Sequence, residues 1–232
     1  MDLFGESIAQ AIRMLGSNDP EVWRITLLTL RVSGTATLIS VLVGVPLGVF
    51  LALLRVSSRG FLVSLINSGM GLPPVVAGLL VSMLLSRYGP LGHLDLIFTP
   101  TAMVIAQSVI AVPIVTGFTL AGVQQLNPRL PHQILALGAS RPQLYWLLIR
   151  EARLAVLAAI MAGFGRVVAE VGASMMVGGN IQGQTRVLTT ATVMEVNKGE
   201  YPIAIALSFI LLMLVWLVTY GLTWLQQRGR TS

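Results

Sequence analysis

The stretch LPHQILALGASRPQ, residues 130–143, is a polar interruption between long apolar stretches of the chain. Pro131 suits the first turn of a helix, and Gly138 stands where the C-terminal cap of that helix is expected. Ser140 and Gln143 have the spacing of a capping box, which opens a second helix. The stretch therefore predicts a short helix, a glycine turn and a longer helix that leads into the following apolar segment.

The sequence on both sides of this stretch is that of a membrane protein. Hydrophobic residues make up 55% of the chain and charged residues 10%, and the mean hydropathy is +0.82, far outside the range of soluble domains. A helix needs about 20 residues to cross the apolar core of a bilayer. Five apolar stretches are long enough, namely 32–54, 60–86, 96–128, 154–177 and 201–227. We therefore predict an all-α integral membrane protein with about five transmembrane helices.

Glycine and proline interrupt several of these spans. The interrupting residues are Gly44 and Gly48 in the first span, Gly69, Gly71 and the pair Pro73-Pro74 in the second, and Pro113 in the third. The glycine pair in the first span lies on one helix face and predicts close packing against another helix. The proline pair removes two backbone donors, so the second span should begin again or kink at Leu72. Pro113 predicts a similar interruption of the third span.

The basic residues predict which side of the membrane each loop faces. An odd number of spans places the two termini on opposite sides. The richer set of loops holds Arg55, Arg59, Arg129, Arg141, Arg150, Arg153, Arg228 and Arg230. The other set holds Arg13, Arg24, Arg87, Arg186 and Lys198, with Arg31 at the end of the first span. We expect the N-terminus outside, and the C-terminus and residues 130–143 in the cytoplasm.

The chain reads as one transmembrane domain, residues 21–227, between two short ends. Residues 1–20 are expected on the outer side, with a short helix on the membrane surface over 1–17 or a frayed terminus as the alternatives. Residues 228–232 form a cytoplasmic tail. The pI of about 10.8 follows from arginines in loops, so topology explains it and no nucleic-acid partner is expected. Cysteine is absent, which removes disulfides and thiolate metal sites.

Residues 130–143 resemble the coupling loop of ABC importer permeases, in which Glu-Ala-Ala, three residues and Gly precede a hydrophobic helix. Aligned on Gly138, the Glu-Ala-Ala positions fall on His132, Gln133 and Ile134, which departs from the family pattern. An amphipathic helix at the membrane face can bury its apolar side in the groove of a soluble partner. The resemblance implies that an ABC ATPase docks on His132, Gln133, Ile134, Leu137, Gly138, Ala139 and Ser140.

Further blocks resemble the oxyanion branch of that family, over the chain from about Pro20 to Leu225. They are Leu72–Gly78, Ile105–Pro113, Asn127–Leu130, Arg166–Ala173, Gly179–Ile181 and Thr185–Ala191. Molybdate permeases are similar, with Arg, three residues, Glu, Phe, Gly and Ala. Val171 in place of Phe, the run Met175–Ile181 and Asp19-Pro20-Glu21 look more like tungstate permeases. The resemblance implies a type I ABC importer permease fold with tungstate as substrate, and molybdate or sulfate as alternatives.

The same resemblance implies the partners and the location. Two copies of the chain would form a homodimer around an oxyanion path, in the inner (plasma) membrane. A periplasmic oxyanion-binding protein would deliver the anion, with Arg186 and Lys198 either meeting it or merely solvated. ATPase subunits on the cytoplasmic side would bind ATP, so no cofactor and no metal are expected in this chain.

Arg166 and Glu170 interrupt the fourth predicted span. A single charge near the middle of a membrane helix costs about 2.5–3.5 kcal/mol on insertion scales, so each must face the bundle or find a partner. Four residues apart on one helix, the two would share a face. One interpretation is an ion pair that packs the bundle or the dimer. The other is that Arg166 helps the anion through a path beside Gly172, while Glu170 keeps the site from trapping it.

Other functional classes lack their motifs. The only lysine, Lys198, is followed by Gly199, so the chain has no phosphate loop with which to hydrolyse ATP. A membrane hydrolase would need a nucleophile and a base, but the only histidines are His93 and His132, and neither lies in a zinc or serine-hydrolase motif. A secondary transporter is the remaining alternative, although five spans do not divide into equal repeats.

Overall fold

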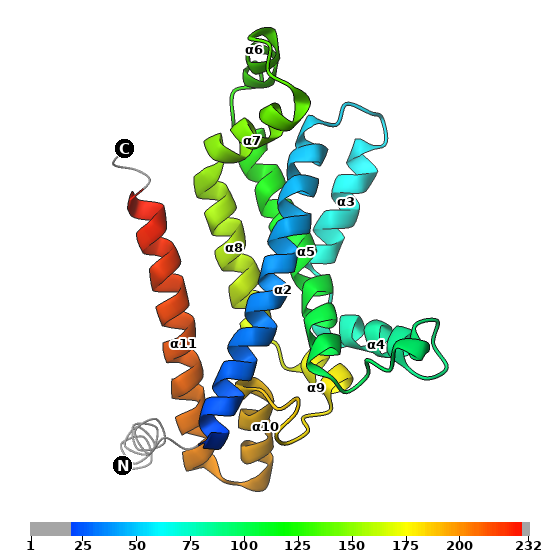
Figure 1. The fold of residues 1–232 in the computed structure, drawn as a ribbon, viewed down its shortest axis with the longest axis vertical. Coiled ribbons are helices and arrows are strands. Elements are labelled where there is room, and N and C mark those ends of the chain that lie inside the picture. The colour runs from blue at the N-terminus through cyan, green and yellow to red at the C-terminus, as the bar shows by residue number, and fades with distance from the viewer. Residues whose placement is uncertain (1–19, 229–232) are drawn as a thin grey trace.

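The computed structural model describes residues 20–228, which form helices joined by short loops and contain no strand (Figure 1). The helices are α2 (Pro20–Leu53), α3 (Arg59–Met70), α4 (Pro74–Leu85), the 3-10 helix η1 (Gly92–Leu94), α5 (Pro100–Gln124), α6 (Leu130–Ala136), α7 (Arg141–Glu151), α8 (Arg153–Val168), α9 (Gly172–Gly178), α10 (Leu188–Lys198) and α11 (Tyr201–Arg228). The prediction of an all-α fold is confirmed. The surface helix expected over 1–17 lies outside the described residues, as do tail residues 229–232.

Three of the described helices, α2, α5 and α11, are each long and apolar enough to cross a membrane. Two further spans form only if each bent pair counts as one, with bends of 100° between α3 and α4 and 59° between α8 and α9. Counted in this way, residues 20–228 have five candidate spans, the number that the sequence predicts. Figure 1 shows α2 beginning and α11 ending at opposite ends of the bundle, as an odd number of spans requires.

Helix α2 begins at Pro20, not at Val32 where the charge-free stretch begins. Its 34 residues rise about 51 Å at 1.5 Å per residue, which exceeds the apolar thickness of a bilayer. The helix therefore continues beyond the lipid core and carries Arg24 and Arg31 in its first turns. The uncharged stretch marks only the apolar part of α2, because the first turns of the helix carry charged residues.

The two proline predictions have different outcomes. Helix α3 ends at Met70 and α4 begins at Pro74, so the predicted break at Leu72 is confirmed, and Figure 1 shows α4 lying across the bundle. The predicted interruption at Pro113 is wrong, because α5 continues through it. A Cβ atom on Gly69 would lie 2.9 Å from the Pro113 ring. The ring therefore occupies space that a glycine on α3 leaves open.

Three apolar clusters hold the bundle together. The α7 core joins α2, α5, α7 and α8 through Val45, Val49, Val115, Val123, Leu144, Leu148, Ala152, Val156 and Ala159. The α9 core includes Ala77 and Val81 of α4, Met103 and Ile110 of α5, and Ala173 and Val177 of α9. The α10 core joins the start of α2 to α10 and α11. The α7 core and the α9 core thus stabilise opposite halves of the bundle.

The glycine pair of the first span packs as predicted. A Cβ atom on Gly44 would lie 3.0 Å from Val115 Cβ, and one on Gly48 would lie 2.8 Å from the Thr116 carbonyl oxygen. Both neighbours belong to α5. The two glycines therefore allow α2 and α5 to approach closely along the centre of the molecule.

Candidate coupling surface and substrate path

The turn between α6 and α7 has the geometry that residues 130–143 predict. Gly138 has a φ of +86°, its N–H donates to the Leu135 carbonyl oxygen at 3.0 Å, and the Ala139 N–H donates to the Ile134 carbonyl oxygen at 3.4 Å. These are the two bonds of a Schellman motif, with glycine at the left-handed position. A Cβ atom at Gly138 would meet nothing within 4 Å, so the backbone conformation, and not lack of space, favours glycine there.

Helix α7 is capped and anchored as a separate helix. The Ser140 N–H donates to Gln143 Oε1 at 2.7 Å, which confirms that bond of the predicted capping box. Leu144 and Leu148 are buried in the α7 core. The helix ends at Glu151, and α8 begins at Arg153 after a turn. The predicted single helix leading into the membrane is therefore two helices, of which α7 is bound firmly to the bundle.

Helix α6 lies on the surface of the bundle and has no buried residue. Leu130 and Ile134 are half-buried and pack against the α7 core. The predicted docking residues that are exposed are His132, Gln133, Leu137, Gly138 and Ser140, while Ala139 is half-buried. Leu137 is 88% exposed and Leu135 is 44% exposed. Two large apolar side chains beside polar ones suit a surface that another protein covers.

The loop between α2 and α3 contacts α6. Arg55 Nη2 lies 3.2 Å from His132 Nε2, and Arg59 Nε donates to the Leu51 carbonyl oxygen at 3.1 Å, at the end of α2. His132 stands at the position of the family's glutamate, and its partner is an arginine of the same chain. The sequence gives no local signal for this contact, because the two residues are 77 positions apart.

Glu170 lies at the break of the fourth span, after α8 has ended at Val168. It is only 4% exposed, and its Oε1 accepts the Ala173 N–H at 2.9 Å, so the carboxyl satisfies a free donor at the start of α9. Thr189 Oγ1 of α10 donates to the Glu170 carbonyl oxygen at 3.0 Å. Glu170 therefore holds together the end of α8, the start of α9 and α10.

Arg166 does not pair with Glu170. Arg166 is on α8 and exposed, whereas Glu170 is off the helix and buried, and no ion pair joins them in the described part of the chain. The prediction that the two share a helix face is wrong, because the helix ends before Glu170. The interpretation of Arg166 and Glu170 as a bundle ion pair fails for the same reason.

Gly172 is a packing residue at the start of α9. A Cβ atom there would lie 2.8 Å from Val75 Cγ2 of α4. On the other side of the same contact, a Cβ atom on Gly78 would lie 2.7 Å from Ala173 Cα. The two short helices that follow the membrane breaks, α4 and α9, therefore approach each other closely.

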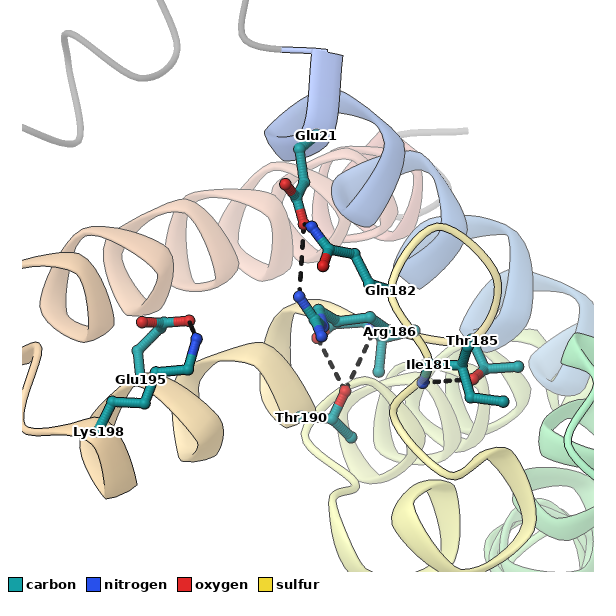
Figure 2. Close-up of polar contacts among 9 residues, drawn as sticks. Glu21, Ile181, Gln182, Thr185, Arg186, Thr190, Glu195 and Lys198 are labelled. Atoms are coloured by element: carbon teal, nitrogen blue, oxygen red, sulfur yellow. Dashed lines mark hydrogen bonds and ion pairs between the residues drawn. The ribbon is translucent and has the colours of Figure 1, made fainter.

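A cluster of charged side chains joins α2 to the loop before α10 (Figure 2). Glu21 Oε1 accepts from Gln182 Nε2 at 2.7 Å and lies 3.4 Å from Arg186 Nη1. Lys198 pairs with Glu195 at 2.9 Å. Both cations that the sequence offered to a delivery protein thus have a carboxylate partner. Among the described residues, no group of His, Asp and Glu side chains is placed to hold a metal ion.

The geometry of a capped surface helix on a broken-helix bundle agrees with the sequence comparison. Residues 44–231 match the family described as binding-protein-dependent transport system inner membrane component. The chain belongs to this family. It is thus a multi-pass membrane subunit of a transport system. The match to an inner membrane component and the long apolar helices both support the membrane location.

Two relatives and one solved structure place this transport-system component more closely. The tungstate uptake system permease protein TupB of Peptoclostridium acidaminophilum is 38% identical over 98% of this chain and 100% of its own length. The molybdenum transport system permease protein ModB of Escherichia coli (strain K12) is 29% identical over 86% of this chain and 94% of its own. A chain of the MetNI methionine ABC transporter, in inward-facing conformations, matches with a TM-score of 0.72 and 18% identity, over 93% of this chain and 97% of its own, and shows the fold.

Within this permease fold, the predicted residues gather at two separate places. Those of residues 132–140 lie on α6 and the turn after it, and those of residues 166–172 lie at the α8–α9 break. Sequence reasoning missed Arg55 beside His132 and Thr189 beside Glu170. It also missed the buried bond from Gln107 Nε2 to Ser174 Oγ at 3.2 Å. Each of these three contacts joins residues that are far apart along the chain. Periodicity and motif spacing give no information on such contacts.

Proposed function

We propose that this chain is the permease subunit of an ABC importer that moves an oxyanion, tungstate first, across the inner membrane. The observation that carries the proposal is the full-length match to a tungstate permease, stronger than the match to a molybdenum permease. Molybdate and sulfate are the alternatives within the family, and a secondary transporter is the alternative outside it. A separate ATPase subunit binds ATP, and this chain hydrolyses none.

The α6–α7 end faces the cytoplasm, and two ATPase subunits hold it there. Support comes from the arginines of the loops at this end, which the positive-inside rule assigns to the cytoplasm. The exposed Leu135 and Leu137 give each ATPase an apolar contact, and α7 transmits its movement because Leu144 and Leu148 fix it to the bundle. The N-terminus of α2 then lies outside and the C-terminus inside.

Two copies of the chain form the path between them. An exposed arginine in the membrane-embedded part of the chain cannot face lipid without a cost of about 2.5–3.5 kcal/mol, so Arg166 faces water or a second copy. Arg166 has no counter-charge from Glu170, so its guanidinium can attract a passing oxyanion. A binding protein delivers the anion at the α10 end, which lies opposite the α6–α7 end. Lys198 is paired with Glu195 there, so it is not a free cation for the anion.

Reconstitution tests the function. The chain, its ATPase and its binding protein are incorporated into proteoliposomes with ATP inside, and uptake of tungstate, molybdate and sulfate is measured separately. We expect ATP-dependent uptake of tungstate above the other two. Uptake that proceeds without ATP or without the ATPase would indicate a secondary transporter. Preference for molybdate or sulfate would leave the permease assignment and change the substrate.

Arg166→Gln tests the path. Removing the charge should lower uptake at least about tenfold, because a contact of about 1.5–3 kcal/mol between the guanidinium and the oxyanion is lost. The dimer and the ATPase complex should still assemble. Arg166→Lys keeps the charge and should restore part of the uptake. Unchanged uptake in Arg166→Gln would exclude a role in the path. Loss of assembly together with uptake would mean that Arg166 only holds the two copies together.

A further inference from the structure

A cavity of about 410 Å³ lies between the end of α2, α6 and the start of α7. Apolar side chains that line it include Phe50, Leu53 and Leu144. Polar side chains of Arg55, His132, Arg141 and Tyr145 also line it. No aspartate or glutamate is among the residues that line it. The cavity therefore combines apolar and basic side chains.

Nothing in the described chain neutralises the two arginines of this cavity. Arg55 contacts His132, and neither Arg55 nor Arg141 forms an ion pair. In the loops assigned to the cytoplasm, 54–59 and 125–153, the one acidic residue is Glu151, ten positions beyond Arg141 on α7. Two cations that line one cavity without a carboxylate favour an anion from outside the chain.

An apolar track leads from the bilayer to the cavity. Val43, Leu47, Phe50 and Leu54 follow one another at intervals of four, three and four residues, so they lie on one face of α2 and just beyond its end. The first three are 46%, 38% and 46% exposed, and Phe50 and Leu54 also line the cavity. A ligand that fits both parts has an anionic group and a long apolar chain, which describes a phospholipid.

We propose that this cavity binds an anionic phospholipid of the inner leaflet. Arg55 and Arg141 hold the phosphate, the Tyr145 hydroxyl donates to it, and an acyl chain lies along the α2 track. Basic pockets between helices on the cytoplasmic side are the places where anionic headgroups bind. The lipid joins α6 to the end of α2, so it positions the surface that the ATPase holds. The inference rests on the cytoplasmic placement of α6 proposed above.

The test uses the purified full chain without its ATPase, so it does not depend on transport. The chain is placed in nanodiscs of phosphatidylcholine or of phosphatidylcholine with phosphatidylglycerol, and retained lipid is identified by native mass spectrometry. The variant Arg55→Gln/Arg141→Gln is compared with Arg129→Gln/Arg150→Gln, which removes the same charge at two arginines of the same end that do not line the cavity.

We expect the preference for phosphatidylglycerol to fall about 5-fold for each cavity arginine removed and about 30-fold for both. It should stay within about 2-fold of wild type in the control pair, because binding falls off with distance from the charge. Arg55→Lys/Arg141→Lys should keep most of it, since lysine also binds phosphate. If the double glutamine variant does not fold, each single variant should still show its 5-fold loss.

Three results would overturn the proposal. Equal losses in the two glutamine pairs would mean attraction by the whole basic surface, with no site. An unchanged lipid preference, with weaker binding of the ATPase to Arg55→Gln/Arg141→Gln, would mean that ATPase carboxylates occupy the cavity. Displacement of phosphatidylglycerol from the wild-type chain by millimolar inorganic phosphate would mean that the ligand is free phosphate. A permease that transports normally can give any of these results, so they do not bear on the proposed function.

Discussion

The two halves of the bundle are stabilised in different ways. The α7 core joins α2, α5, α7 and α8 through aliphatic side chains such as Val115 and Leu148. The α9 core joins two short helices that follow membrane breaks, and specific polar contacts accompany it, from Glu170 to Ala173 and from Gln107 to Ser174. The first half carries the exposed α6 segment, and the second contains both bends of more than 40°.

The difference follows from the solvent around each half. A helix that breaks inside a bilayer leaves backbone N–H and C=O groups without water, so the protein itself must satisfy them. Glu170 and Thr189 do this at the α8–α9 break. The turn at Gly138 lies on the surface, where backbone bonds and water suffice. Side-chain hydrogen bonds should therefore matter more in the α9 half, and packing and backbone conformation more in the α7 half.

The largest effect is expected from Gly48→Ala, in the α7 half. Its Cβ would lie 2.8 Å from the Thr116 carbonyl oxygen, and backbone atoms cannot move aside, so the cost should be about 3 kcal/mol, at the upper end for overpacking. Thermal unfolding of the purified chain in detergent measures it. Gly34→Ala is the control. Gly34 lies on the same helix, and a Cβ atom there would meet nothing within 4 Å. Equal stability of the two variants would disprove close packing of α2 on α5.

Glu170→Ala should cost about 2 kcal/mol, because it leaves the buried Ala173 N–H without an acceptor. Glu170→Gln keeps an oxygen at that place and should be nearly as stable as the wild type. The same unfolding measurement compares the two. Equal destabilisation by both variants would show that the negative charge of Glu170 matters, and that the hydrogen bond to α9 does not.

Gly138→Ala should cost about 1 kcal/mol in the turn, because a left-handed backbone disfavours a Cβ. The equilibrium constant for the correct turn should fall about 5-fold, and the ATPase activity stimulated by the loaded binding protein should fall by up to this factor. Gly199→Ala is the matched control, since Gly199 has a φ of +81° and equally open surroundings at the other end of the bundle. An equal loss of activity in both variants would remove any special role for the α6–α7 turn.

The smallest effect concerns the Gln107–Ser174 bond. Hydrogen bonds between membrane helices average about 0.6 kcal/mol in double-mutant cycles, so a cycle of Gln107→Leu and Ser174→Ala should give a coupling of this size. Reversible unfolding in mixed micelles measures it. A coupling near zero would indicate that the Gln107–Ser174 bond does not contribute to the stability of the α9 half.

Much of the fold follows from local sequence. Four of the spans follow from stretches without charged residues and the fourth in order from a mainly apolar stretch, because crossing a bilayer requires a long run of apolar residues. The break at Leu72 and the turn at Gly138 were found because proline and glycine act on the backbone at their own position. The interruption predicted at Pro113 is wrong, since α5 continues through it, and the packing of the ring against Gly69 of α3 is a tertiary contact that local sequence does not show.

The candidate site was predicted only in part. The structure forms the predicted helix and glycine turn over residues 130–143, and the docking of an ATPase there stays a prediction. Ile134 packs partly against the α7 core, and no pattern pointed to the contact between Arg55 and His132. The Arg166–Glu170 pair was misread because four-residue spacing implies a shared face only while the helix continues. The helix ends at Val168, and contacts with α9 and α10 hold Glu170 there.

Local sequence was enough to predict that this chain crosses a membrane several times, that a helix breaks beside the proline pair after Leu72, and that a glycine turn follows the short helix α6. Those properties depend on the hydropathy and backbone preferences of neighbouring residues. The tertiary structure alone decided which charges are paired, which predicted contact residues are exposed, and how the broken helix ends are satisfied. Those properties depend on residues far apart in the chain, whose proximity exists only after the helices have packed.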